Sequence, residues 1–172
     1  MTSPHPIKTL GSCRVSSPLP LNRDPESQDF RFVEEGSVVL HSVREAPGVS
    51  ETVSPFEMAG PRADVFFDPP KVHVGIVTCG GLCPGSNNVI RTLVMQLYHN
   101  YGVRNIHGFR YGFQGFIPKY GHEVRNLTPE SVKNIHYLGG SILSSSRGPQ
   151  DVGEIVDCLD RNSIRVLFVI GG

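Results

Sequence analysis

The chain has 172 residues, 38% of them hydrophobic, and its 16 Lys and Arg residues balance 16 Asp and Glu residues. This balance gives no electrostatic case for nucleic acid or a membrane surface as the main partner, and no apolar run approaches the roughly 20 residues of a membrane span. Four cysteines in a chain this long do not suggest a disulfide framework, so we expect a cytoplasmic protein.

Residues 1–70 are rich in Pro, Ser, Glu and Gly and lack the periodic apolar surface of a segment that folds alone, so they predict an N-terminal extension. A short strand is expected around Val38–Val43. "ADVFFDPP" indicates an edge strand that the two prolines end. The first 23 residues are Ser-rich and contain no acidic residue, which is a weak sign of an organellar transit peptide.

Regular secondary structure is predicted from residue 72 onward. The sequence "VHVGIVT", residues 72–78, is apolar enough for a strand buried on both faces, as in parallel sheets. Apolar residues then recur at helical spacing. Ser86 or Asn87 suits the N-cap of this helix, and Gly102 is expected to end it. The next strand is expected at residues 103–109.

A glycine-rich loop is expected over residues 110–121. In "LTPESVKNIHYLGG", Thr128 suits an N-cap and Pro129 the first helical position, and Gly139 is expected to end that helix. The serine-rich segment 141–146 indicates a short strand, and a loop follows it.

A helix is expected within residues 152–163, and the strongly apolar segment 164–170 predicts a buried strand. Strands and helices therefore alternate about three times along this part of the chain. Such alternation favours an α/β fold in which helices cover both faces of a parallel sheet.

The glycines Gly80 and Gly81 lie where the first strand of this sheet turns into its helix. Open α/β sheets bind ligands at this edge, and the amides of a helix's first turn attract anions. Without a Cβ, both residues let a phosphate or ribose come close to the backbone. The alternative, that the glycines only make a tight turn, is at least as common for an isolated glycine pair.

Arg147 and Gly148 follow the predicted strand at 141–146, which places them at the same sheet edge. A guanidinium donates two parallel hydrogen bonds to a phosphate, and Gly148 allows close backbone approach beside it. The alternative is a solvated loop arginine. Phe113, in the glycine-rich loop, is a candidate to lie against a nucleotide base, and it fits a packing role equally well.

Other site classes find less support. The two common phosphate-binding fingerprints, G-x-G-x-x-G and G-x-x-x-x-G-K-[ST], are absent. The glycine spacing and the lack of a suitably placed acidic residue disfavour a nicotinamide-binding Rossmann protein. Cys79 and Cys83 lack a second Cys or His pair nearby in the sequence, so we assign no metal ligand.

The string "GIVTCGGLCPGSNNVIR" resembles the phosphofructokinase family, specifically the group of plant-type, bacterial and protist ATP-using enzymes. "YGVRNIHGFRYGFQGF", "LTPESVKNIHYLGGSILSSSRGPQD" and "VLFVIGG" continue the resemblance in order. It implies an α/β, phosphofructokinase-like three-layer sandwich with a mostly parallel sheet. Residues 71–172 are expected to form the first part of the nucleotide-binding domain, with residues 1–70 as its extension.

The resemblance implies phosphoryl transfer from ATP, with Mg²⁺, to the 1-hydroxyl of fructose 6-phosphate, by an enzyme that is a homo-oligomer when full length. It assigns nucleotide contacts to Gly80, Gly81, Arg147 and Gly148. The family's magnesium ligand is expected just after Gly172, and its Thr-Ile-Asp-x-Asp motif, which carries the catalytic base, is not in this sequence. We therefore assign no catalytic residue.

Because those motifs are missing, we expect a fragment that binds ATP weakly and shows no kinase activity alone. Two alternatives stay open at this point. The phosphoryl donor is pyrophosphate instead of ATP, or the chain is a non-catalytic partner of a full-length subunit.

Overall fold

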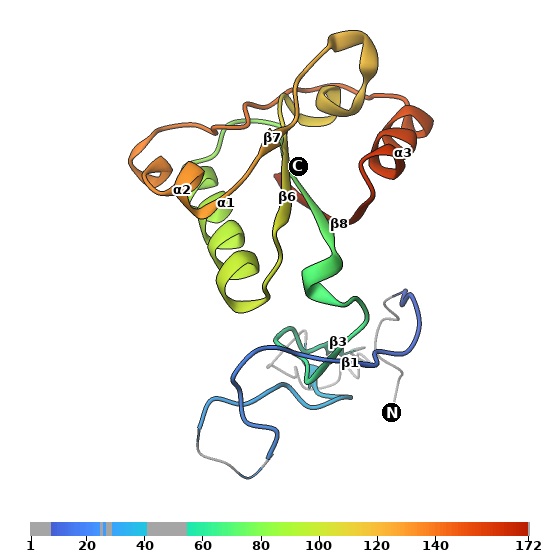
Figure 1. Cartoon of the computed structure of the whole chain (residues 1–172), viewed down its shortest axis with the longest axis vertical. Coiled ribbons are helices and arrows are strands. Elements are labelled where there is room, and N and C mark those ends of the chain that lie inside the picture. The colour runs from blue at the N-terminus through green and yellow to red at the C-terminus, as the bar shows by residue number, and fades with distance from the viewer. Residues whose placement is uncertain (1–7, 25, 27–28, 41–54, 172) are drawn as a thin grey trace, which may run out of the picture. The chain divides into compact units, whose positions relative to one another are not determined.

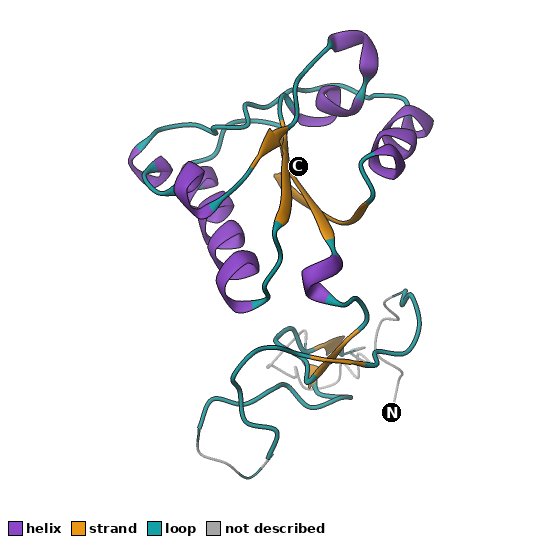
Figure 2. Cartoon of the chain, viewed as in Figure 1, coloured by secondary structure: helices purple, strands orange, loops and turns teal. Residues whose placement is uncertain are grey.

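The computed structural model describes residues 8–24, 26, 29–40 and 55–171, in two units, Met1–Phe67 and Asp68–Gly172 (Figures 1 and 2). Part of the Ser-rich segment 1–23, part of the strand expected at Val38–Val43, and Gly172 lie outside the described residues.

The first unit contains two small antiparallel sheets. Strand β1 (Val15–Ser16) pairs with β4 (Asp64–Val65), and β2 (Val38–Val39) pairs with β3 (Phe56–Glu57). Arg62 links segments of this unit that are distant in sequence. Its guanidinium donates to the Glu34 carbonyl at 2.9 Å and to the Glu57 carboxylate at 2.9 Å. The segment is therefore more structured than the extended arm that its composition suggested.

The second unit is built on a four-stranded sheet of order β7-β6-β5-β8. Strands β5 (His73–Cys79), β6 (Asn105–Phe109) and β8 (Ile164–Gly171) are parallel, as predicted, whereas β7 (Arg125–Asn126) is antiparallel to β6. Strand β7 was not predicted, because its two residues are polar and exposed and show no alternation of apolar and polar side chains.

Helices cover both faces of this sheet. Helix α1 (Ser86–Met95), which a π-helical turn (Gln96–Asn100) extends, lies with α2 (Pro129–Val132) on one face, and α3 (Val152–Arg161) lies on the other (Figure 1). Single-turn 3-10 helices occur at Pro69–Lys71, Gly112–Phe116, Pro118–Tyr120 and Ile135–Tyr137. The three-layer α/β arrangement agrees with the predicted fold class.

Two predicted helix boundaries are wrong. The N-cap of α1 is Gly85, at φ +88°, and Ser86 is the first helical residue, with its hydroxyl donating to the Cys83 carbonyl at 2.8 Å. Helix α2 has the predicted Thr128 cap but ends at Val132 and not at Gly139. A 3-10 turn follows at Ile135–Tyr137, and both Val132 and Ile135 are buried.

Two predicted strands also differ. Residues 141–146 form a loop and no strand, because their backbone is bound to the end of β5 and to the 111–116 turn. Strand β8 is present, but of its residues only Ile164 is buried, and Val169 is 47% exposed. The reason is that β8 is an edge strand of the described sheet.

The two faces of β5 bury different residues. Val77 and Cys79 belong to the cluster under α3, together with Phe109 and Phe116, whose rings stack with centroids 4.2 Å apart. Because side chains alternate along a strand, Thr78 points to the opposite face, which α1 covers. This alternation places the Thr78 hydroxyl beside the 141–146 loop, as described below.

Because of His107, on β6, we expect the stability of the protein to depend on pH. Burial, and then the nearby His73 ring, hold the pKa of His107 below its ordinary value of 6.5, and the His107 Nε2 has no hydrogen-bond partner among the described residues. The unfolded chain therefore binds this proton more readily than the folded state does. The free energy of unfolding should fall as the pH drops through about 6.5.

The measurement is urea unfolding of the wild type, His107→Gln and His136→Gln at about pH 7.5 and about pH 5.5. His107→Gln should lose less stability on acidification than the wild type. His136 is exposed, so its variant should follow the wild type. Equal losses in all three proteins would contradict the assignment to His107.

Candidate functional site

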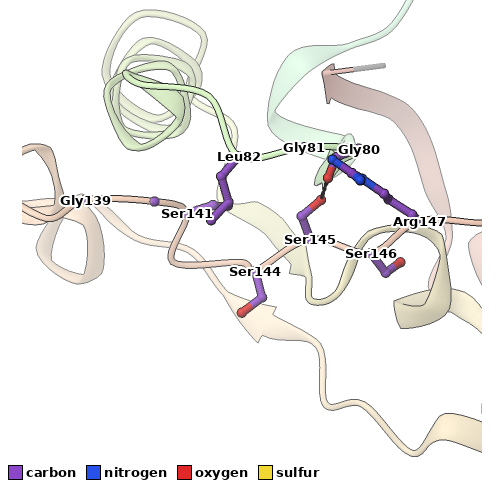
Figure 3. A pocket seen from close by; sticks show the side chains of 10 residues that line it. Gly80, Gly81, Leu82, Gly139, Ser141, Ser144, Ser145, Ser146 and Arg147 are labelled. Atoms are coloured by element: carbon purple, nitrogen blue, oxygen red, sulfur yellow. Dashed lines mark hydrogen bonds between the residues drawn. The ribbon is translucent and has the colours of Figure 1, made fainter.

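A cavity of about 710 Å³ opens where β5 ends, at the carboxyl edge of the parallel strands. Its walls come from the turn after β5 and from the 139–147 loop (Figure 3). The residues that line it are Gly80, Gly81, Leu82, Gly139, Gly140, Ser141, Ser144, Ser145, Ser146 and Arg147. Its size lies in the range of about 300–1,000 Å³ that is typical of small-molecule sites.

The glycine turn and the serine loop are joined by direct hydrogen bonds. The Gly80 amide donates to the Ser146 carbonyl at 3.3 Å, and the Ser145 hydroxyl donates to the Gly80 carbonyl at 2.5 Å. Gly80 has φ +77°, a conformation that favours glycine. Since both backbone groups of Gly80 are already bonded, this residue shapes the turn and leaves ligand contact to its neighbours.

Arg147 reaches over this turn (Figure 3). Its Nη2 atom lies 3.1 Å from the position that a Cβ on Gly81 would occupy, so the guanidinium is in close contact with this glycine. Within the described part of the chain, neither Gly81 nor Arg147 makes a hydrogen bond or ion pair. The Gly81 amide and the guanidinium are thus free donors at one cavity.

Three serines before Arg147 add hydroxyl groups to the cavity wall, and of these the Ser145 hydroxyl already donates to the Gly80 carbonyl. Ser144, Ser145 and Ser146 all line the cavity, and Arg147 is the one charged residue among the described residues that do so. These serines were predicted to lie in a strand, and their place in the site was not predicted. The run "SSSR" is itself a usable signal, because consecutive hydroxyl groups beside an arginine offer donors but no negative charge.

Asn87 fixes the far wall of the cavity. It is 2% exposed on the buried face of α1, its side-chain amide donates to the Leu138 carbonyl at 3.0 Å, and its Oδ1 accepts from the Ile142 amide at 2.8 Å. These two bonds bracket Gly139 and Gly140. A residue expected only to cap a helix thus anchors the loop that lines the site.

The structure brings together three of the four predicted contacts. Gly80, Gly81 and Arg147 line the same cavity, whereas Gly148, which is exposed at φ +95°, does not line it. Phe113 packs against the cluster under α3, with its ring centroid 6.2 Å from that of Phe116. This contact favours the packing alternative for Phe113.

A second, smaller cavity of about 240 Å³ adjoins the glycine turn and the start of α1. Cys79 and Cys83 both line it. Burial raises the pKa of the Cys79 thiol, and a hydrogen bond with the Phe113 backbone opposes this shift. Among the described residues, no group of three or more His, Cys, Asp or Glu is placed to hold a metal ion.

The chemistry of the main cavity follows from its donors. An amide N–H and a guanidinium meet at the glycine turn, serine hydroxyls lie in the same cavity wall, and the described lining residues include no carboxylate. Such a set complements the oxygens of an anion and repels a bare cation. Since the cavity also lies at the carboxyl edge of a parallel sheet, the arrangement suits the phosphates of a nucleotide.

Comparisons with known proteins agree with this chemistry. The family model described as Phosphofructokinase matches residues 73–172. An ATP-dependent 6-phosphofructokinase from Amycolatopsis methanolica is 45% identical over 96% of this chain, and one from Entamoeba histolytica is 42% identical over 96%. A chloroplastic ATP-dependent 6-phosphofructokinase from Arabidopsis thaliana is 41% identical over 98%.

The chain spans 37%, 36% and 31% of the length of these three relatives. Among solved structures, Pichia pastoris phosphofructokinase in the T-state is similar to 60% of this chain, with a TM-score of 0.53 and 26% identity, and the match covers 11% of that protein. No helix in the described residues has the length and apolar character needed to cross a membrane.

Proposed function

The chain belongs to the phosphofructokinase family, and we propose that its second unit holds the phosphates of ATP for a 6-phosphofructokinase reaction. In that reaction the terminal phosphoryl group of ATP passes to the 1-hydroxyl of fructose 6-phosphate. The relatives' names, which specify ATP, favour this donor over the pyrophosphate alternative.

One observation carries the proposal. The free guanidinium of Arg147 lies directly over Gly81, at a cavity whose described lining has no negative charge. An arginine without an internal partner that is nonetheless packed against a glycine turn is arranged for an external anion.

Each residue has a defined part in this proposal. The Gly81 amide and the Arg147 guanidinium donate to phosphate oxygens and offset the charge of the transferring group. Ser144 and Ser146, whose hydroxyls make no hydrogen bond within the described residues, supply further donors, and Gly80 fixes the turn. Gly148 adds backbone freedom next to Arg147 without lining the cavity.

Mg²⁺ supplies charge neutralisation on the phosphates when it is bound with ATP. The donor set at this cavity does not fit a cation, because amides, hydroxyls and a guanidinium replace the carboxylates that Mg²⁺ prefers. We therefore assign no residue of this chain to the metal and derive no step through it. Homo-oligomeric assembly and a cytoplasmic location remain predictions, and one similar relative is named as chloroplastic.

The affinity expected for the chain alone is low. A hydrogen bond to a charged group contributes about 1.5–3 kcal/mol, and the cost of association offsets part of what each further donor adds. A net gain of about 4 kcal/mol is equivalent to a Kd near 1 mM, so we expect affinity in the millimolar range. The measurement must therefore detect weak binding.

Titration of the isotopically labelled 172-residue chain with ATP, followed by NMR, provides such a measurement. The amide signals of Gly81, Leu82 and residues 144–147 should shift and approach saturation in the millimolar range. Inorganic triphosphate should shift the same signals, whereas adenosine should not. Shifts confined to other parts of the chain, or equal shifts with adenosine, would refute phosphate binding here.

A further inference from the structure

We propose that Thr78 is a positioning residue, whose buried hydroxyl holds the serine loop so that Arg147 meets the phosphates. The proposal rests on the function proposed above for this cavity. Thr78 does not line the main cavity, although it lines the smaller cavity beside it, so its hydroxyl reaches Arg147 through the loop. Its role therefore differs from that of the residues expected to contact ATP.

The contacts of Thr78 are unusual for a strand residue. The side chain is on β5, two residues before Gly80, and Thr78 is only 4% exposed. Its hydroxyl donates to the Ser144 carbonyl at 2.5 Å and lies 3.0 Å from the Ser141 hydroxyl. Since the Thr78 hydroxyl has one proton and donates it to the Ser144 carbonyl, the Ser141 hydroxyl is the donor to the Thr78 oxygen.

The backbone conformation of Ser144 has to be stabilised by contacts from outside its own loop. Its φ of +57° is in the left-handed region, which is unfavourable for a residue with a Cβ. A strained residue in a loop relaxes unless the surrounding structure fixes it. The Thr78 bond to its carbonyl fixes it from one side, and the bond between the Tyr111 amide and the Leu143 carbonyl, at 2.8 Å, fixes the preceding residue.

This geometry is transmitted directly to Arg147. Ser145 and Ser146, which separate Ser144 from Arg147, make the two hydrogen bonds to Gly80 that close the turn onto the loop. If Ser144 relaxes, both bonds and the placement of the guanidinium over Gly81 change together. Thr78 thus connects the sheet to the charged group through three consecutive loop residues.

The experiment compares the wild type with Thr78→Val, which keeps the shape but removes the hydroxyl, and with Thr78→Ser, which retains it. Hydrogen exchange of the Gly80 amide, without ATP, reports directly on the closure of the loop. This amide should exchange faster in Thr78→Val, whereas the Ile90 amide within α1 should keep its rate. The Kd for ATP, from the same NMR titration, should weaken roughly 5-fold, the change expected for one lost hydrogen bond.

Thr78→Ser should restore both readouts. Thr92→Val is the matched control, because Thr92 is exposed on α1 and the same substitution there should change neither. An unchanged exchange rate of the Gly80 amide in Thr78→Val would overturn the positioning role, whatever the Kd for ATP in that variant. If the wild type itself fails to respond to ATP, the proposed function falls, while the exchange comparison still decides whether Thr78 holds the loop.

Discussion

Replacing Arg147 with glutamine is expected to weaken ATP binding by about 10-fold or more without unfolding the protein. The guanidinium is exposed and makes no ion pair or hydrogen bond within the described part of the chain, so its loss removes no internal contact. A hydrogen bond to a charged phosphate contributes about 1.5–3 kcal/mol, which corresponds to a change of roughly 10- to 150-fold in Kd.

The readout is the ATP titration by NMR, combined with thermal unfolding of each variant. Arg147→Lys should give an intermediate Kd, because an ammonium keeps the charge but lacks the planar fork. Arg165→Gln is the matched control, since Arg165 is exposed at the amino end of β8, at the opposite edge of the sheet. An Arg147→Gln variant that binds ATP as tightly as Arg165→Gln does would show that the guanidinium is a solvated loop residue.

Replacing Gly112 with alanine is expected to lower both the stability of the second unit and its response to ATP. Gly112 has φ +56°, and a Cβ there would lie 2.9 Å from the Ser146 hydroxyl and 3.1 Å from the Ser146 amide nitrogen. The left-handed backbone costs about 1–2 kcal/mol for alanine, and the overlap should add about 1–3 kcal/mol. Relief requires Ser146, in the loop that carries Arg147, to shift away from Gly112.

Gly121 supplies a control for this prediction. It has φ +62°, but a Cβ there would meet no atom within 4 Å. Gly121→Ala should therefore carry the backbone cost alone and leave the ATP-induced shifts unchanged. Denaturant unfolding and the ATP titration of both variants separate the two contributions. Equal loss of stability in the two variants would mean that Gly112 is not packed against Ser146.

Much of the site's framework follows from local sequence pattern. The apolar runs of β5 and β8 and the helical spacing in α1 and α3 located the parallel strands and two of the helices. The same patterns placed the glycine turn at the carboxyl edge of the sheet, whereas Arg147 was placed there from a strand at 141–146 that the structure does not contain. Prediction reached this far because apolar periodicity reflects burial, which sets where the main strands and helices lie.

Prediction failed where a segment is held by partners far away in the sequence. Residues 141–146 were expected to form a strand, but bonds from Thr78, Gly80 and Tyr111 hold them as a loop. Helix α2 was expected to run to Gly139, but it ends at Val132, and Arg91 and Asn87 bind the carbonyls of Lys133 and Leu138 in the segment that follows. No local pattern records such contacts, since each depends on how the sheet packs.

The amino-acid sequence by itself determined the α/β class, the order of the main elements and the family to which the chain belongs. It also supplied the chemical groups for anion binding, because residue type and spacing are properties of the chain alone. Only the tertiary structure decided that Arg147 lies over Gly81, that Gly148 does not line the cavity, and that Thr78 holds the loop. The physical reason is that these contacts join residues more than sixty positions apart, and only packing of the folded sheet brings such residues together.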